Sequence, residues 1–284
     1  MARGIAIHIG VNDPASNRHG RLSMSERFAW KMAELSHQAG YGAIHMLCGA
    51  EATRGAVHAL LSAAAAALRP RDTLFVSFSG HGSQVTDENG DERDDLDETW
   101  CLYDGNLVDD DLMDIWRKAA AGTRVLVVSE SCFAGGMRYG DELLAERPPR
   151  LRRPVYRSGG PLRGVKQYVQ EVPSSCISRE TLDEEGIQAS VLLMAGAGER
   201  QRAREGLYLE HLLKIWDGGA FRGTFCDLHQ RLCVSVRDEN PAQEPQIIML
   251  GREDTEFPLQ TAFHLDIPVM RDGGAPVMRG VMRG

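Results

Sequence analysis

The chain has 284 residues, of which 43% are hydrophobic and 25% charged, a composition that is ordinary for a soluble globular protein of one large α/β domain or two small ones. The formal net charge of −8 argues against a general nucleic-acid binder, and no apolar run is long enough to span a membrane. The 6 cysteines form no CxxC pair, and the first residues fit a strand better than a signal peptide, so we expect reduced thiols and a cytoplasmic location.

The first half of the chain alternates short apolar runs with segments of helical periodicity. Strands are predicted at 4–10, 43–48, 73–79 and 124–129, and helices at 25–38, 54–68 and 109–121. Thr53 is predicted to cap the second of these helices. This alternation is typical of a parallel sheet with helices on both faces.

The character of the sequence changes after residue 136, where arginines stand among prolines and glycines with little periodicity. A strand at 190–195, helices at 205–216 and 221–236, and a last strand at 245–250 are predicted to follow. His229 stands between Cys226 and Cys233, but this segment has the pattern of an amphipathic helix, which favours structural thiols over a metal site. We predict one domain over 1–266 and a tail over 267–284.

Two predicted strands end in small-residue turns that carry reactive side chains. His81 follows the strand at 73–79, and Cys132 follows the strand at 124–129. The carboxyl ends of neighbouring parallel strands are where open α/β sheets place their chemistry, so the pair predicts a nucleophilic cysteine with a histidine base. The backbone amides of Gly82 and Cys132 are candidate donors to an oxyanion. The alternative is that His81 caps a turn and Cys132 is a small buried hydrophobic residue.

Two motifs carry a resemblance to a known family. They are Ser79-Gly-His81-Gly-Ser-Gln84 and Glu130-Ser-Cys132-Phe-Ala-Gly135, and the opening strand and the segments at 97–104 and 190–201 fit the same layout. The chain resembles a caspase-like cysteine peptidase (clan CD, peptidase family C14), and in particular a prokaryotic metacaspase or orthocaspase. The separation of His81 and Cys132 is also close to the roughly 50 residues typical of caspases.

The resemblance implies a caspase-like three-layer sandwich with a mainly parallel sheet of about six strands. It divides the domain into a large-subunit-like half at 1–136, an Arg-rich loop at 137–187 and a small-subunit-like half at 188–266. It implies that Cys132 is the nucleophile and His81 the general acid and base in the hydrolysis of protein or peptide substrates. By analogy with metacaspases a monomer is expected, while the net charge and the lack of a long apolar run predict no nucleic-acid or membrane partner.

Substrate specificity is the least determined part of the resemblance. Metacaspases cleave after Arg or Lys, and their pocket acid two residues before the nucleophile corresponds to Glu130, while Ser79 matches a second pocket position. Phe28 stands where the family has its other pocket acid, with Glu26 nearby. A basic P1 residue is therefore expected, and an uncharged P1 residue is the alternative. Glu130 as a merely solvated or hydrogen-bonded carboxylate also stays open.

Acidic residues gather between 87 and 114. An EF-hand is excluded, because Glu92 stands where the sharp turn of that loop requires glycine. By resemblance to metacaspases, Ca²⁺ is expected as an activator and not as a catalytic ion. The candidate ligands are Asp95, Asp97, Asp109, Asp110, Asp111 and Asp141. The alternative is a solvated acidic loop that holds no ion.

The Arg-rich loop offers sites for autoprocessing if the enzyme cleaves after basic residues. Arg152 or Arg153, and Arg163 or Lys166, are the candidate sites, and a flexible basic linker is the alternative. Two further functions compete with a peptidase. One is a catalytically inactive caspase homologue that serves as a binding or scaffold module, and the other is a non-peptidase cysteine hydrolase or acyltransferase on a similar sheet.

Overall fold

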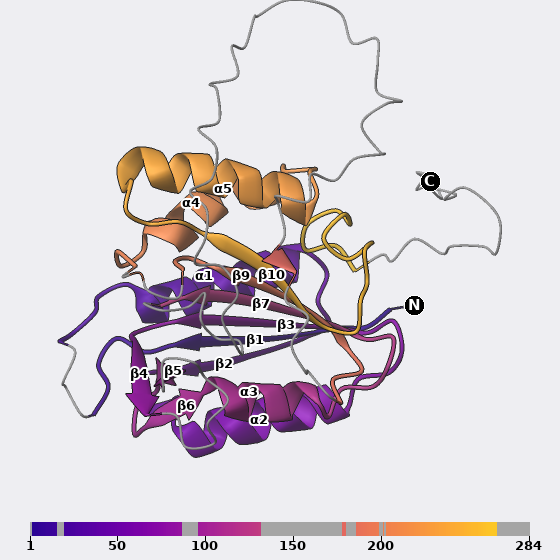
Figure 1. The fold of residues 1–284 in the computed structure, drawn as a ribbon, viewed down its shortest axis with the longest axis horizontal. Coiled ribbons are helices and arrows are strands. Elements are labelled where there is room, and N and C mark those ends of the chain that lie inside the picture. Colours follow the sequence, from indigo (N-terminus) through magenta and orange to yellow (C-terminus); the bar gives the residue numbers. More distant parts are fainter. Residues whose placement is uncertain are drawn as a thin grey trace, which may run out of the picture.

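The computed structural model has a central sheet between two layers of helices (Figure 1). It describes residues 2–15, 20–86, 96–131, 178–179, 186–198, 201 and 203–265. Within these ranges, seven strands form the main sheet in the order β2-β1-β3-β7-β9-β10-β8. Their bounds are β1 (Gly4–Gly10), β2 (Ala43–Cys48), β3 (Thr73–Ser79), β7 (Arg124–Glu130), β8 (Ser178–Arg179), β9 (Ser190–Ala195) and β10 (Gln246–Gly251).

All neighbouring strands of this sheet run parallel except β9 and β10, which are antiparallel. The prediction of a mainly parallel sheet of about six strands is therefore confirmed, with the two-residue β8 at one edge. One group of helices covers one face of the sheet, and a second group covers the other (Figure 1). The first group is α1 (Ser25–Gln38), α4 (Leu207–Trp216) and α5 (Phe225–Glu239), and the second is α2 (Arg54–Ala66) and α3 (Asp109–Trp116).

Strand β1 shows why the sheet needs both helix layers. Its seven residues are all buried, so the strand meets apolar surroundings on both faces. Ile7 and Ile9 pack with the α2 and α3 side, whereas Ala6 packs with the α1, α4 and α5 side. His8 is also fully buried, and its two ring nitrogens lie 2.7 Å and 2.8 Å from the hydroxyls of Ser77 and Ser36. Burial lowers the pKa of His8 to about 3, so this histidine is neutral.

A second, antiparallel sheet lies beside the end of β3. It consists of β4 (Gly82–Thr86), β5 (Leu96–Cys101) and β6 (Asn106–Val108). No strand was predicted in these segments. The predicted helix at 109–121 is too long, because α3 ends at Trp116 and turns follow it.

A buried ion pair fixes the amino end of β7. Arg124 is 4% exposed, and its Nε donates to Asp254 at 2.7 Å while its Nη1 donates to Gln260 at 2.6 Å. The guanidinium also lies 5.0 Å from the centre of the Phe257 ring. These contacts tie the segment after β10 to the amino edge of the sheet.

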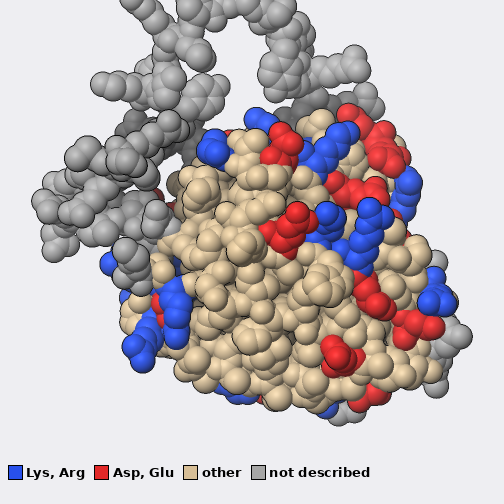
Figure 2. All heavy atoms as spheres, turned by 180° about the vertical axis from the view of Figure 1, so that it is seen from behind, with Lys and Arg blue, Asp and Glu red and all other residues tan. Residues whose placement is uncertain are grey.

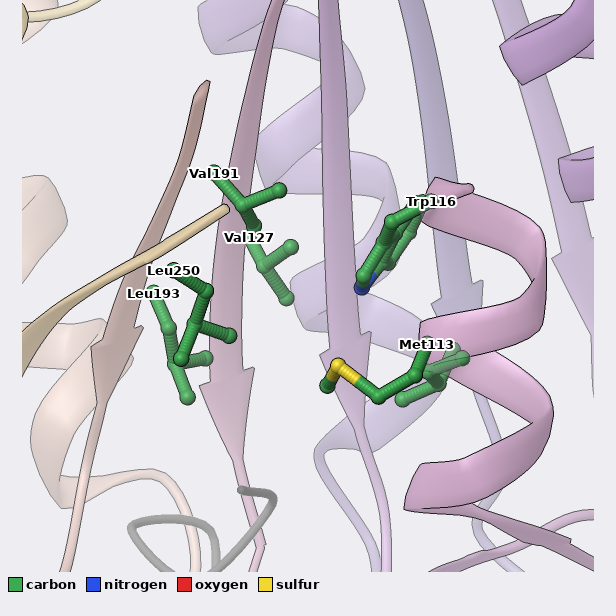
Figure 3. Close-up of a pocket in the computed structure, with 7 residues that line it drawn as sticks. Met113, Trp116, Val127, Val191, Leu193 and Leu250 are labelled. Atoms are coloured by element: carbon green, nitrogen blue, oxygen red, sulfur yellow. The ribbon is translucent and has the colours of Figure 1, made fainter. Parts of the chain in front are cut away.

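An apolar gap of about 10 Å³ separates α3 from the sheet (Figure 3). It is lined by Leu112, Met113, Trp116, Val127, Val191, Leu193 and Leu250. A space this small and apolar offers a water molecule no polar partner, so it is a packing gap and not a binding site.

The surface carries charges of both signs. Figure 2 shows one face on which Lys and Arg stand among Asp and Glu, beside a broad area that bears neither. Exposed ion pairs also occur on the protein, for example Arg204 with Glu239 and Arg237 with Glu244. Among the described residues, no helix has the length and apolar character needed to cross a membrane.

Candidate active site

Two neighbouring strands end side by side, each just before one residue of the candidate dyad in the sequence. β3 and β7 are paired in parallel so that Ser79 lies opposite Glu130, the last residue of each strand. The N–H of Gly80 donates to the Glu130 carbonyl at 3.3 Å, which holds the two ends together. His81 and Cys132 are each two residues beyond this matched pair in the sequence. Cys132 itself lies outside the described residues.

His81 lies on the short link between the two sheets. Its carbonyl accepts from the N–H of Cys101 at 2.9 Å, and Gly82 immediately begins β4 opposite Trp100. Its Nε2 is 3.0 Å from the carbonyl oxygen of Gly20. Because a carbonyl can only accept, this hydrogen bond requires a proton on Nε2 and leaves the basic lone pair of the neutral ring on Nδ1. The second sheet thus fixes the backbone that carries the candidate base.

Buried rings and hydroxyl groups pack together near the carboxyl ends of β3 and β7. The Phe78 and Trp100 rings stack with their centres 4.6 Å apart. Trp100 Nε1 donates to the Ser129 hydroxyl at 3.1 Å, and that hydroxyl is 3.3 Å from the hydroxyl of Ser131. Ser131, which precedes Cys132 in the sequence, is buried, so this network fixes the chain up to the residue before the candidate nucleophile.

Glu130 points into the protein at the amino end of α4. The residue is 4% exposed, and its Oε1 accepts from the N–H of Tyr208 at 2.8 Å and from that of Leu209 at 3.4 Å. Its Oε2 is buried and has no hydrogen-bond partner. Burial raises the pKa of Glu130 to about 8, and Glu210 and Glu205 add to this while the two N–H groups oppose it. The carboxyl is therefore neither solvated nor fully satisfied.

Phe28 lies near the same helix end, and Glu26 does not. A Cβ placed on Gly206, which precedes α4, would come within 3.0 Å of the Phe28 ring. Glu26 instead lies beside the end of β2, where its Oε1 is 3.3 Å from the Cβ position of Gly49. The structure thus brings Phe28 to the helix end that binds Glu130 and directs Glu26 elsewhere. Ser79 is buried at the end of β3 beside Glu130.

Glu205 is a further acidic residue near Glu130, and no sequence pattern indicated it. Its Oε1 accepts from the N–H groups of Ser23 and Met24 at 2.5 Å and 2.7 Å, just before α1 begins. Its charge is also close enough to Glu130 to contribute to the raised pKa of that residue. Glu205 is separated from Ser23 by 182 residues, so no local pattern could reveal the contact.

The candidate cation ligands fall into three groups. Asp95 and Asp141 lie outside the described residues. Asp97 on β5 and Asp109, the first residue of α3, are buried. Asp110 is the second residue of α3. Asp111 has other partners, since Arg54 Nη2 donates to both its oxygens, at 3.1 Å and 2.8 Å. Within the described part of the chain, no three His, Cys, Asp or Glu side chains form a group that could hold a metal ion.

The remaining cysteines do not form a metal site in the described structure. No disulfide bond joins Cys48, Cys101, Cys226 and Cys233 to one another. Cys233 Sγ lies 3.3 Å from Nε2 of His229, one turn earlier on α5. Burial lowers the pKa of His229 to about 4, as expected for a neutral histidine in a helix that packs against the core.

A mainly parallel sheet between two helix layers, with two paired strand ends that precede a histidine and a cysteine in the sequence, is the arrangement expected of a caspase-like domain. The family model described as the metacaspase, peptidase C14 domain matches residues 28–138. Residues 28–138 thus belong to the metacaspase, peptidase C14 family, and the resemblance predicted from the two motifs is confirmed. This is a family of cysteine-type endopeptidases.

Individual relatives agree with this assignment. Metacaspase-1 of Schizosaccharomyces pombe is 41% identical over 73 residues, which are 24% of this chain and 17% of that protein. Metacaspase-1 of Cryptococcus neoformans is 42% identical over 72 residues, again 24% of this chain and 16% of that protein. The matching segment is thus a small part of the curated relatives.

Solved structures match over most of the chain. A protein of Geobacter sulfurreducens is 30% identical with a TM-score of 0.68, and the match covers 92% of this chain and 98% of that one. Caspase-1 of Spodoptera frugiperda is 12% identical with a TM-score of 0.51, and the match covers 89% of this chain and 92% of that one. The second likeness shows the fold alone.

Proposed function

We propose that the protein is a cysteine endopeptidase with Cys132 as nucleophile and His81 as general acid and base. The observation that supports this proposal is the register of β3 and β7, whose matched last residues, Ser79 and Glu130, each precede a member of the dyad by two positions in the sequence. A histidine near a thiol raises the thiolate fraction or accepts its proton during attack.

The proposed reaction follows from these two groups. The Cys132 sulfur forms a bond to the scissile carbonyl carbon, and the oxyanion is stabilised by the N–H of Gly82. When the C–N bond breaks, His81 donates its proton to the leaving amine. Water, deprotonated by His81, then hydrolyses the thioester and restores the thiol.

We propose that Glu130 binds a basic P1 side chain. Its buried Oε2 has no hydrogen-bond partner, and a guanidinium or ammonium would supply both the missing donor and the opposite charge. Phe28 lies near the same helix end, and its ring, which is buried in the substrate-free protein, would border the methylene stem of Arg or Lys. Ser79 completes the proposed pocket, whereas Glu26 is directed towards Gly49 and takes no part in this arrangement. A pocket for an uncharged P1 residue is the second candidate, favoured by the apolar ring of Phe28.

Ca²⁺ activation is part of the same proposal. Asp97 and Asp109 are buried carboxylates on segments that β5 and β6 bring together, and hard oxygen ligands of this kind suit Ca²⁺. Asp111 is the weakest candidate, because Arg54 already neutralises it. We also propose autoprocessing within residues 137–187, which lie almost entirely outside the described ranges, and a monomeric enzyme in the cytoplasm.

The test is hydrolysis of fluorogenic peptides that differ only at P1, with and without Ca²⁺. The expected result is cleavage after Arg and Lys that is lost in Cys132→Ala and in His81→Ala. No turnover of any peptide would reject the peptidase and favour the scaffold module. Cleavage only after uncharged residues would retain the peptidase and reject the role given to Glu130.

A further inference from the structure

The connection between β9 and α4 runs along the candidate pocket. Of its residues, 196–198, 201 and 203–206 are described. It begins at Gly196, whose N–H donates to the Ser129 carbonyl at 2.8 Å, so it starts beside the end of β7. It ends at α4, whose first N–H groups bind Glu130. Whatever fixes this connection therefore also fixes the donors to the pocket carboxylate.

One buried glutamine holds both ends of the connection. Gln243 lies between α5 and β10 and is fully buried. Its Nε2 donates to the Gly196 carbonyl at 2.8 Å, and its Oε1 accepts from the Arg204 N–H at 2.9 Å. A side-chain amide is suited to this task, because it presents one donor and one acceptor at fixed spacing and carries no charge.

Tyr208 transmits this order to Glu130. Its side chain packs directly on Gly196, where an added Cβ would come within 3.0 Å of the Tyr208 Cβ. The backbone N–H of the same residue donates to Glu130 at 2.8 Å. Gln243, Gly196, Tyr208 and Glu130 thus form one continuous series of contacts from the α5–β10 turn to the pocket.

We propose that Gln243 is a positioning residue, which holds the start of α4 against Glu130 and so sets the geometry of the P1 pocket. The proposal rests on the proposed function, since it assumes that Glu130 binds the P1 side chain. Among the described residues, the hydrogen bonds of the Gln243 side chain go to the connection and to Asn240 and not to residues 79–82 or 129–131, so we expect its effect to be on binding and not on the chemical step.

The structure supplies a matched control in Gln260. This residue is also a buried glutamine with two hydrogen bonds, accepting from Arg124 at 2.6 Å and donating to the His264 carbonyl at 3.1 Å. It lies at the amino edge of the sheet, opposite the candidate site. Gln243→Ala and Gln260→Ala remove comparable buried contacts, so a difference in function between them reports on position and not on stability alone.

Two measurements test the proposal. In Gln243→Ala, we expect KM for an Arg-P1 peptide to rise about tenfold with kcat changed less than about twofold, because a disordered pocket weakens binding of substrate and transition state alike. Hydrogen exchange of the amides at 207–209 is expected to become about tenfold faster. Gln260→Ala should change neither KM nor the exchange rate. If Gln243→Ala does not fold, Gln243→Met replaces it, because methionine retains the side-chain volume without the amide, and the same changes are expected.

The outcomes separate the two proposals. Unchanged exchange at 207–209 in both Gln243 variants would overturn the positioning role, whether or not the enzyme is active. Faster exchange at 207–209 in the Gln243 variants together with an unchanged KM would also overturn the proposal, because the order of α4 would then not affect the pocket. The proposed peptidase activity would stand in that case. A wild-type protein that cleaves no peptide would reject the proposed function, and the exchange measurement would then decide alone whether Gln243 orders the start of α4.

Discussion

Replacing Glu130 with glutamine tests whether a buried carboxyl limits the stability of this fold. Burial raises the pKa of Glu130 from 4.5 to about 8 in the folded protein. Below pH 4.5 the group is protonated in both the folded and unfolded states and contributes no pH dependence. As the pH rises towards 8, the unfolded state loses this proton while the folded state retains it, so stability falls by about 1.4 kcal/mol per pH unit.

The full span between the two pKa values corresponds to roughly 5 kcal/mol at pH 8 and above. A glutamine keeps an oxygen that accepts from the Tyr208 N–H but cannot ionise. We therefore expect Glu130→Gln to match the parent near pH 5 and to exceed its free energy of unfolding by roughly 3–5 kcal/mol at pH 8.

The measurement is urea unfolding followed by circular dichroism at pH 5, 6, 7 and 8. Both proteins carry Cys132→Ala, which prevents self-cleavage from distorting the transition. Glu34→Gln is the control, because Glu34 is an exposed glutamate on α1 whose replacement should give no comparable gain. A difference between Glu130→Gln and its parent that stays constant from pH 5 to pH 8 would refute the reasoning.

Three further predictions follow from single contacts. The kcat/KM for an Arg-P1 peptide should rise with pH to a plateau above about 8, because Glu130 must ionise to pair with the substrate, and an uncharged-P1 peptide should lack this rise; identical pH–rate profiles would contradict it. Asp254→Ala leaves the buried Arg124 without its carboxylate, so urea unfolding should show a loss of about 3 kcal/mol with KM unchanged, and a loss below about 1 kcal/mol would contradict it. Thr53→Ala removes the hydroxyl that accepts from the Ala56 N–H at 3.2 Å and should cost about 1 kcal/mol by the same assay, whereas Thr53→Ser should cost much less.

Local sequence patterns predicted several strands of the main sheet and the start of some helices. The strands β1, β2, β3 and β9 and the helix α1 lie at the predicted residues. The side chain of Thr53 caps α2 as predicted. These elements are encoded by short apolar runs and capping residues that act within a few positions of the chain. The same patterns predicted that the carboxyl ends of β3 and β7 lie at one edge of the sheet, because neighbouring parallel strands end at the same edge.

The missed features depend on contacts between distant residues. The strand β4 contains one large apolar residue, Val85, so its sequence has no clear strand periodicity. Its partner strand β5 follows only after an acidic segment, so no short turn indicates the pairing. Glu130 meets the start of α4 across 78 residues, and Gln243 meets Gly196 across 47. Glutamine and glutamate are usual surface residues, and only the tertiary structure shows that these two are buried.

The order of strands in the main sheet has a consequence for any protein that is cut between its two halves. β9 and β10 follow the 137–187 segment in the sequence, yet β9 is hydrogen-bonded to β7, which precedes it. The buried pair of Arg124 and Asp254 joins the same two parts of the chain at the opposite edge. A break in the backbone between them therefore leaves two polypeptides that share one hydrogen-bonded ladder and one core. Such a nicked molecule would elute from a sizing column like the intact chain and reveal its cut only on a denaturing gel.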